Sequence, residues 1–182
     1  MMKADIFKNG SEQTIADVLR NKDQRAALQQ QLLQQYPDDT IVAVKLNIPG
    51  PIKTNDKIVK LFKAGIKQIE TILQANGKLL KKIQQNQPTG PENFYVFQLS
   101  GMQVKQLASE FEDHNLLGRL FDIDVMDAKN AHYSRKQLNW PSRKCFICNR
   151  DAKECGRNRT HSVAELQAYV NQVYNEVFSD EG

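Results

Sequence analysis

The sequence has no long apolar run. None of its hydrophobic stretches approaches the ~20 residues that a membrane-spanning helix requires. The opening stretch, MMKADIFKNG, also lacks the apolar segment of a secretory signal. From these two absences we expect a soluble protein of the cytoplasm with no membrane partner.

A strong excess of one charge is missing as well. The formal net charge is +4, which suits an anionic ligand but is too small to indicate a nucleic-acid-binding protein. The chain has 182 residues, of which 40% are hydrophobic, so it can bury a core of ordinary size. We therefore expect a single domain over residues 1–182 and no nucleic-acid partner.

Cysteine is scarce and confined to one place. The three cysteines, Cys145, Cys148 and Cys155, lie within eleven residues, and an odd number argues against a disulfide framework. With His161 they read C-x2-C-x6-C-x5-H, a ligand set that completes the tetrahedral shell of zinc. The segment is poor in apolar residues, so a structural metal would supply folding energy that burial cannot. Two other interpretations stay open: three reduced thiols without a metal, and a redox-active pair of Cys145 and Cys148.

Helices and strands can be predicted from periodicity and capping residues. We expect a helical segment over 11–36 with a break near Asn21–Asp23. Strands are predicted over 40–48, 78–86, 94–100 and 118–127. Two further helices are predicted, one from Asp56 to about Leu73 and one from Ser100 onward. The stretch QPTGPEN is predicted to be a turn-rich connection. The last segment, 143–178, combines the cysteines with a helix over 163–178, and Ser162 with Glu165 forms the capping box that starts this helix.

The order of elements between residues 40 and 127 is β-α-β-β-α-β. This order predicts the α+β class, with a ferredoxin-like, four-stranded antiparallel sheet and two helices on one face. The N-terminal helical segment and the C-terminal Cys/His-rich loop with its helix would be additions to that core. Because the first and last strands of this topology are antiparallel neighbours, we expect Asn47 to Lys53 to lie beside Gly118 and Arg119.

Two acidic residues alternate with apolar ones in GRLFDIDV, residues 118–125. Side chains two positions apart on a strand share a face, so Asp122 and Asp124 point one way while their apolar neighbours face the core. Adjacent carboxylates repel each other unless a cation separates them. Oxygen ligands of this kind suit Mg²⁺, which supports phosphoryl and nucleotidyl transfer. The alternative is an ordinary solvent-facing strand with two exposed acids.

Basic residues surround the cysteines. They are Arg143, Lys144, Arg150, Arg157 and Arg159. Such residues can grip phosphate groups, although any one of them is more often part of a solvated loop. Together with a carboxylate pair they favour a polyphosphate ligand.

Three blocks of the sequence, in order, resemble one known family. LNIPGPIK (46–53), GRLFDIDV (118–125) and the segment from CFIC to His161 and Ser162 (145–162) are similar to the holo-citrate lyase synthases, also named apo-citrate lyase phosphoribosyl-dephospho-CoA transferases. The resemblance extends from about residue 12 to residue 178. It implies an enzyme that takes triphosphoribosyl-dephospho-CoA, attaches the phosphoribosyl-dephospho-CoA part to a serine of the acyl-carrier (gamma) subunit of citrate lyase, and releases diphosphate. A reaction of this nucleotidyltransferase type makes a nucleotidyltransferase-like sheet an alternative to the ferredoxin-like one.

The resemblance also implies roles for individual residues. Asp122 and Asp124 follow Gly118 in the way that paired acids follow a glycine in nucleotidyltransferases. The two aspartates would hold Mg²⁺ on the donor phosphates, and Arg119 would act with them in catalysis. Either aspartate could also take the proton of the serine hydroxyl. The expected substrate-binding residues are Asn47, Lys53, Gly118, Arg157 and Arg159. A different class of function stays open: a non-catalytic, zinc-ribbon-like module that binds a protein or RNA partner through its arginines.

Overall fold

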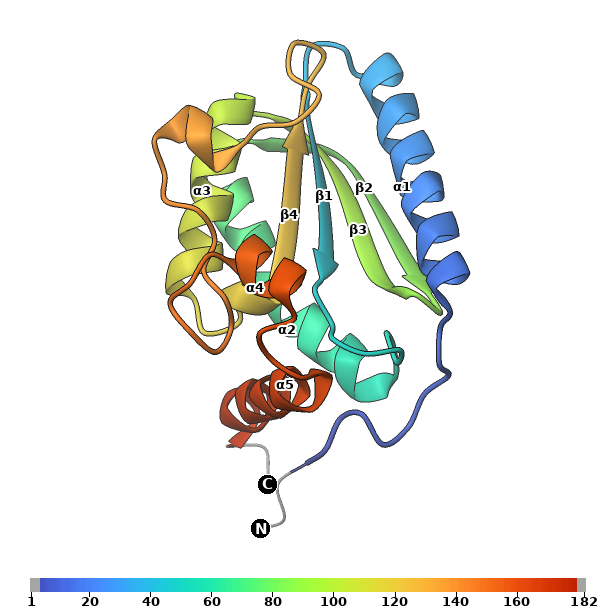
Figure 1. Cartoon of the computed structure of the whole chain (residues 1–182). Helices are drawn as coiled ribbons and strands as arrows, with labels where there is room; N and C mark the ends of the chain where they lie inside the picture. Colours follow the sequence, from blue (N-terminus) through green and yellow to red (C-terminus); the bar gives the residue numbers. More distant parts are fainter. Residues whose placement is uncertain (1–3, 180–182) are drawn as a thin grey trace.

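The structure is a computed structural model that describes residues 4–179 (Figure 1). Its helices are α1 (Ile15–Gln35), α2 (Asp56–Gln74), α3 (Gly101–His114), α4 (Ala152–Asn158) and α5 (Val163–Val177). Its strands are β1 (Thr40–Leu46), β2 (Lys78–Gln87), β3 (Gly90–Gln98) and β4 (Phe121–Met126). Two short 3₁₀ turns, Gly118–Leu120 and Arg135–Leu138, complete the regular structure of the described part of the chain.

The four strands form one antiparallel sheet in the order β2-β3-β1-β4. This is the strand order of the ferredoxin-like topology, so the α+β prediction and the pairing of the first and last strands are confirmed. In the β1–β4 register, Leu46 lies opposite Phe121. The backbone N–H of Asn47 then donates to the carbonyl of Leu120 over 2.7 Å, so the expected proximity of Asn47 to the start of the last strand is also confirmed.

The two faces of the sheet are covered by different helices. The face formed by Val42, Val44, Tyr95 and Phe97 packs against α2 and α3 in the larger core, as the topology predicts. Helix α1 lies on the opposite side of the sheet (Figure 1). There Leu32 packs over a second, smaller apolar cluster of Ile41, Ala43, Phe94, Val96 and Met126. The apolar cluster covers only one end of this face, and the residues at the other end are charged.

Helix α1 runs without interruption, so the predicted break near Asn21–Asp23 is wrong. Asn21 is buried, and its side-chain oxygen accepts a hydrogen bond from Arg25 one turn later over 2.8 Å. A polar residue whose hydrogen bond is satisfied on the helix itself does not need to end the helix. Thr14 and Asp17 form the capping box that starts α1.

The predicted turn-rich connection between β2 and β3 is also wrong in its length. Only Pro88 and Thr89 separate the strands, and Gly90 takes a φ of +124°, a region of backbone conformation that favours glycine. The third strand therefore starts four residues earlier than the predicted 94, and it includes Glu92. Helix α2 starts at Asp56 as predicted, and Asn55 caps it by accepting from the N–H of Ile58 over 3.0 Å.

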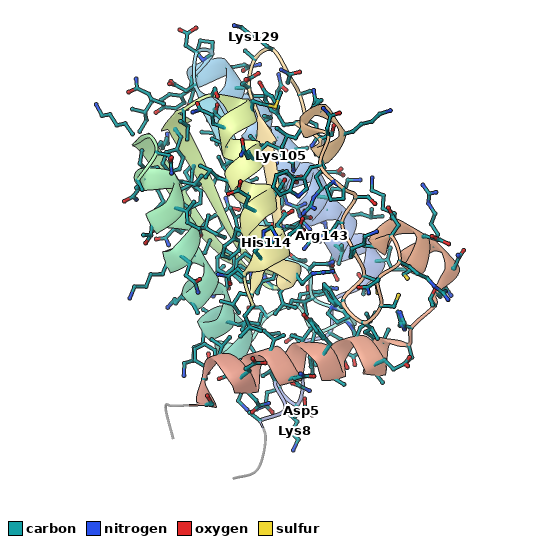
Figure 2. The ribbon with its side chains drawn as sticks, turned by 90° about the vertical axis from the view of Figure 1, so that its left-hand side faces the viewer. Asp5, Lys8, Lys105, His114, Lys129 and Arg143 are labelled. Atoms are coloured by element: carbon teal, nitrogen blue, oxygen red, sulfur yellow. The ribbon has the colours of Figure 1, made fainter. Side chains whose placement is uncertain are left out.

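Strand β4 is an edge strand whose outer backbone groups are nevertheless satisfied. The Ile123 N–H donates to Glu112 Oε1 over 3.1 Å, and Lys105 Nζ donates to the Ile123 carbonyl over 3.4 Å. The Tyr133 N–H donates to the Val125 carbonyl over 2.9 Å, and Arg143 Nη2 donates to the Phe121 carbonyl. Figure 2 labels Lys105 on α3 and Arg143 on the segment that follows β4. Covering an edge in this way blocks pairing with another chain and fixes the strand that carries the two aspartates.

The C-terminal segment is attached to the core by α5. Val170, Val173 and Tyr174 are buried in the larger apolar cluster. The predicted capping box of Ser162 and Glu165 is present at the start of this helix. Within residues 4–179, no helix combines the length and the apolar character needed to cross a bilayer.

Candidate active site

The two aspartates of β4 lie on the sheet face that is opposite to α2 and α3. Phe121, Ile123 and Val125 are buried in the larger core, while Asp122 and Asp124 are partly exposed with 36% and 31% of their side-chain surface accessible. The predicted division of the strand into a core face and an acidic face is therefore confirmed. Their cross-strand neighbours on β1 are Lys45 and Ala43 respectively.

The two carboxylates have different electrostatic surroundings. Lys45 Nζ lies 2.8 Å from one oxygen of Asp122, and Arg143 Nη1 lies 3.8 Å from the other. Burial acts to raise the pKa of Asp122, but Lys45, Arg143 and Lys105 together hold it below its usual value. Burial and the neighbouring charge of Asp122 raise the pKa of Asp124. Positive charge is thus sufficient at the first carboxylate and insufficient at the second, so the pair can accept a further cation.

A polar cavity of about 200 Å³, the sheet cavity, opens on the same side of the sheet between α1, the end of β1 and the start of β3. Arg25, Lys45 and Lys53 line it, together with Asn47 and Glu92. Lys53 Nζ donates to the carbonyl of Ile48 over 2.6 Å, and burial together with the charge of Lys45 lowers the pKa of Lys53. Cations held together in this way favour an anionic ligand such as a polyphosphate.

Glu92 is one of the sheet-cavity residues that the sequence did not point to, as are Arg25 and Lys45. It is only 4% exposed, and one carboxylate oxygen accepts from Arg25 Nε over 2.8 Å. Its other oxygen has no hydrogen-bond partner among residues 4–179. In the strand register Lys45 lies between Glu92 on β3 and Asp122 on β4, and its ammonium group pairs with Asp122.

Arg119 and Gly118 do not face the aspartates. Arg119 Nη1 donates to the carbonyl of Cys145 over 3.1 Å, so its side chain joins the sheet to the cysteine segment. Gly118 is buried against the end of α3, where a Cβ atom would come within 2.0 Å of the carbonyl oxygen of Phe111. The structure therefore gives Arg119 and Gly118 each a structural role, and their contact with substrate stays a prediction.

The two arginines that were predicted to bind phosphate lie in or directly after α4 and not on the sheet. Arg157 is exposed on α4, and Arg159 is the residue that ends this helix, with a φ of +47°. Arg143 occupies the position beside Asp122 instead. Which of the clustered basic residues reaches the acidic face depends on the path of the chain between β4 and α4, and local sequence contains no signal for that path.

The four cysteine and histidine side chains come together as their spacing predicted. The ligand atoms of Cys145, Cys148, Cys155 and His161 all lie within 4.8 Å of one another. Cys148 Sγ is 3.4 Å from both Cys155 Sγ and His161 Nε2. Metal–sulfur distances of about 2.3 Å place tetrahedral ligand atoms at similar mutual separations, so the cluster can hold a metal ion.

The thiols of Cys145 and Cys155 have opposite pKa shifts. Burial acts to raise the pKa of Cys145, but the backbone N–H groups of Ile147 and Cys148 lower it overall. Burial, with a hydrogen bond to Cys148, raises the pKa of Cys155 to about 11. A metal that binds here must displace a proton from Cys155, so its affinity will increase with pH.

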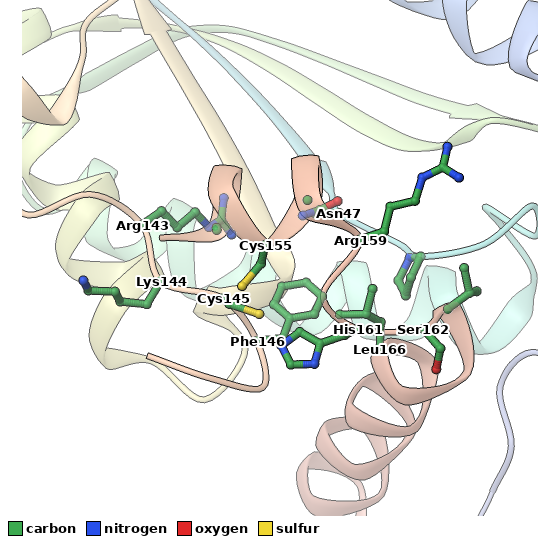
Figure 3. A pocket seen from close by; sticks show the side chains of 14 residues that line it. Asn47, Arg143, Lys144, Cys145, Phe146, Cys155, Arg159, His161, Ser162 and Leu166 are labelled. Carbon is green, nitrogen blue, oxygen red and sulfur yellow. The ribbon is translucent and has the colours of Figure 1, made fainter. Parts of the chain in front are cut away.

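A larger cavity of about 580 Å³, the Cys/His cavity, lies beside this cluster (Figure 3). Its walls come from the end of β1, the segment before α4, α4 itself and the start of α5. Its lining residues are Asn47, Pro49, Arg143, Lys144, Cys145, Phe146, Ala152, Cys155, Gly156, Arg159, His161, Ser162, Val163 and Leu166. Asn47 also lines the sheet cavity, and Arg143 also contacts Asp122, so the two cavities adjoin.

Comparison with known proteins identifies the family. The family described as apo-citrate lyase phosphoribosyl-dephospho-CoA transferase matches residues 13–177. The chain belongs to this family. A Streptococcus pyogenes serotype M18 protein, named probable apo-citrate lyase phosphoribosyl-dephospho-CoA transferase, is 36% identical over 181 residues, which cover 98% of this chain and 94% of that protein.

Two further relatives extend the comparison. The apo-citrate lyase phosphoribosyl-dephospho-CoA transferase of Citrobacter koseri is 29% identical over 154 residues, covering 84% of each chain. Protein CitXG of Leuconostoc mesenteroides subsp. cremoris is 37% identical over 171 residues, which cover 93% of this chain but only 36% of that protein. The resemblance inferred from the three sequence blocks is thus confirmed over nearly the whole chain.

Proposed function

We propose that the chain transfers the phosphoribosyl-dephospho-CoA group to a serine of the apo-citrate lyase acyl-carrier subunit, with Asp122 and Asp124 as the ligands of a Mg²⁺ ion. The observation that carries this assignment is the pair of carboxylates on one open sheet face, next to a cavity lined by Arg25, Lys45 and Lys53. Family membership supports the reaction, and the geometry supports the place where it occurs.

The residues present fit Mg²⁺ better than a metal that needs a full protein shell. The two aspartates offer only oxygen atoms, and Mg²⁺ usually takes one or two carboxylates and keeps its other positions for water and phosphate. Burial and the charge of Asp122 raise the pKa of Asp124 although Lys45, His132 and Lys105 act to lower it, so the cations already present do not offset the cost of ionising this carboxylate. When bound, the ion would neutralise charge on the donor phosphates and on the departing diphosphate.

The basic side chains provide the rest of the electrostatic stabilisation. The serine oxygen forms a new bond to phosphorus while the bond to the diphosphate breaks, so negative charge grows on the leaving group. Lys45 and Lys53 line the sheet cavity, and Arg25 is held there by Glu92. Fixed cations of this kind stabilise developing charge without reorganising during the reaction.

Lys45 has a second role in this scheme. In the structure its ammonium group neutralises Asp122 at 2.8 Å. A divalent ion at the aspartates would take over that role, and Lys45 could then contact the phosphates or turn toward the unpartnered oxygen of Glu92 on the neighbouring strand. The lysine therefore belongs to the substrate-binding set, beside the predicted Asn47 and Lys53.

We assign zinc to the Cys/His cluster, in a structural role. The donor set has three sulfur atoms and one ring nitrogen, a combination typical of structural zinc sites and unlike the oxygen sets of Mg²⁺ or Ca²⁺. Such a site would fix the cysteine segment against the sheet, where Arg119 and Arg143 are bonded to backbone carbonyls. A cytoplasmic location, where thiols stay reduced, fits this proposal.

The alternative function, a non-catalytic module for a protein or RNA partner, is not favoured. It needs neither the aspartate pair nor the cavity of cations beside it, and the family match spans the part of the chain that contains both. It would depend instead on Arg157 and Arg159, and would weaken steeply with salt.

A transfer assay tests the proposal. The purified acyl-carrier subunit is incubated with triphosphoribosyl-dephospho-CoA and this protein, with Mg²⁺ or with EDTA followed by Zn²⁺ alone, and its intact mass is measured. We expect the mass to increase by one prosthetic group only with Mg²⁺, and Asp122→Asn to prevent the increase. An undiminished mass gain in the Asp122→Asn variant would refute the role given to the carboxylates.

A further inference from the structure

The Cys/His cavity has a different chemical character from the sheet cavity. Its walls include the apolar side chains of Phe146, Val163 and Leu166, and its basic residues are Arg143, Lys144 and Arg159. Its volume of about 580 Å³ lies within the range of typical small-molecule sites. An apolar pocket with a few cations suits a ligand that joins an aromatic or aliphatic body to phosphate groups.

We propose that the Cys/His cavity binds the dephospho-CoA part of the donor, with the adenine ring against Phe146 and the diphosphate of dephospho-CoA near Arg159. This proposal rests on the proposed function, because it takes the donor from the transfer reaction. It gives the cysteine segment a part in substrate selection as well as in folding.

The position of the cavity relative to the aspartates is the first support. Arg143 lines the cavity and also lies 3.8 Å from Asp122, and Asn47 lines both cavities. A donor that places its reacting phosphates over the aspartates therefore has the Cys/His cavity directly beside it. The sheet cavity, at about 200 Å³, is too small to hold the rest of such a molecule as well.

The aromatic wall is the second support. The ring of Phe146 stacks on Tyr169 of α5, with ring centres 5.4 Å apart and planes inclined by 21°. Phe146 also lines the cavity, in the position seen in Figure 3. A ring that is fixed in this way offers a preorganised surface for a purine base, which stacks readily on aromatic side chains.

The backbone of Arg159 is the third support. It ends α4 in the left-handed region, where glycine is the usual residue because it has no Cβ atom. The chain places an arginine there, at the edge of the cavity. A side chain kept at an unfavourable backbone position is a reason to look for function at that position.

The test measures binding of dephospho-CoA itself to the full-length, metal-loaded protein by titration calorimetry. The main variant is Gly156→Trp, because Gly156 lines the cavity and a Cβ atom there would meet no other atom within 4 Å. The control is Leu116→Trp, which adds the same ring at an exposed apolar position that does not line the cavity. A second variant, Phe146→Leu, removes the stacking surface and keeps an apolar side chain.

We expect dephospho-CoA affinity to fall about tenfold or more in Gly156→Trp and severalfold in Phe146→Leu, since base stacking commonly contributes that much. Leu116→Trp and Asp122→Asn should bind it about as tightly as the natural chain. Binding that is unchanged in both Gly156→Trp and Phe146→Leu would overturn the inference. Loss of dephospho-CoA binding in Asp122→Asn alone would place this ligand at the aspartates and would also overturn the inference. Full transfer activity in Asp122→Asn would instead refute the proposed function.

Discussion

At the scale of single residues, the two aspartates differ in what they contribute to the folded state. Asp122 is stabilised by Lys45 and Arg143, while Asp124 is partly buried beside a like charge. We predict that Asp124→Asn increases the free energy of unfolding by about 0.5–1 kcal/mol at neutral pH, and that Asp122→Asn decreases it by a similar amount. Urea unfolding of the metal-free protein measures both changes.

The effect of Asp124→Asn should depend on pH. The pKa of Asp124 is raised in the folded protein, so its ionisation opposes folding as the pH rises through the folded pKa. Below the ordinary aspartate pKa of about 4 the carboxyl is protonated in both states and the penalty disappears. The stability gain of the variant should therefore be present near pH 7 and absent near pH 3.5, and a gain that is constant with pH would contradict this electrostatic explanation.

Lys45 provides a second prediction at this scale. Its ammonium group occupies one side of Asp122, so Lys45→Met should bind Mn²⁺, a spectroscopic substitute for Mg²⁺, at least as tightly as the natural chain. Transfer should nevertheless fall by about tenfold or more, because a cation facing the leaving diphosphate is lost. Electron paramagnetic resonance measures free Mn²⁺ directly, and much weaker Mn²⁺ binding in Lys45→Met would be inconsistent with the position assigned to this lysine.

Several residues of the site could be predicted because their signal is local. The alternation in FDIDV fixes which face the aspartates occupy, and the spacing of three cysteines and a histidine fixes their grouping. Lys45 and Glu92 could not be found in that way. Lys45 is placed at the site only by its register against Asp122. Glu92 lies in β3 rather than in the connection because the turn between β2 and β3 is shorter than its glycine- and proline-rich sequence indicated.

At the scale of elements, one helix approaches the sheet unusually closely. Gly65 of α2 faces Phe121, and a Cβ atom there would come within 2.2 Å of the ring. We predict that Gly65→Ala decreases the free energy of unfolding by about 1–3 kcal/mol through overpacking, although alanine is the better helix former. Thermal or urea unfolding measures the change.

Gly156 of α4 is the matched control for Gly65. A Cβ atom there meets nothing within 4 Å, so Gly156→Ala should be neutral or stabilising by up to about 1 kcal/mol. If both substitutions had the same effect on unfolding, helix propensity rather than the contact with Phe121 would explain the result for Gly65.

The cysteine segment is the element that we expect to depend on a metal. Between residues 143 and 162 the buried side chains are Cys145 and Cys155 of the Cys/His cluster, whereas the strands bury large apolar residues. We predict that chelation of the metal increases amide hydrogen exchange in this segment and leaves β1, β3 and β4 protected. Equal exchange with and without chelator would mean that the segment is held by its hydrogen bonds to the sheet alone.

The strand order belongs to the same scale and was predictable, because β-α-β-β-α-β permits few antiparallel arrangements. The continuity of α1 and the way its N-terminal half borders the sheet cavity were not. Helix α1 lies outside the repeating pattern, and Arg25 and Asn21 reach the site because the helix packs on the face of the sheet opposite to α2 and α3.

At the scale of the whole molecule, the proposal divides the donor between two cavities in different parts of the chain. The sheet holds the charged groups that act on phosphates, and the C-terminal segment supplies an apolar pocket beside them. Arg143 joins the two parts, because its guanidinium group contacts Asp122 and the carbonyls of Arg119 and Phe121, and the residue also lines the Cys/His cavity. The net charge of +4 on the chain would favour encounter with an acidic carrier subunit.

The most direct test of the carboxylate role uses Asp124→Asn, because this variant is expected to be at least as stable as the natural chain and a loss of function cannot then reflect unfolding. The measurement is the intact mass of the acyl-carrier subunit after incubation with triphosphoribosyl-dephospho-CoA, Mg²⁺ and the variant. We predict no gain of the prosthetic group over a period in which the natural chain modifies the carrier completely. Complete modification by Asp124→Asn would contradict the assignment of the aspartates as the metal-binding centre of the reaction.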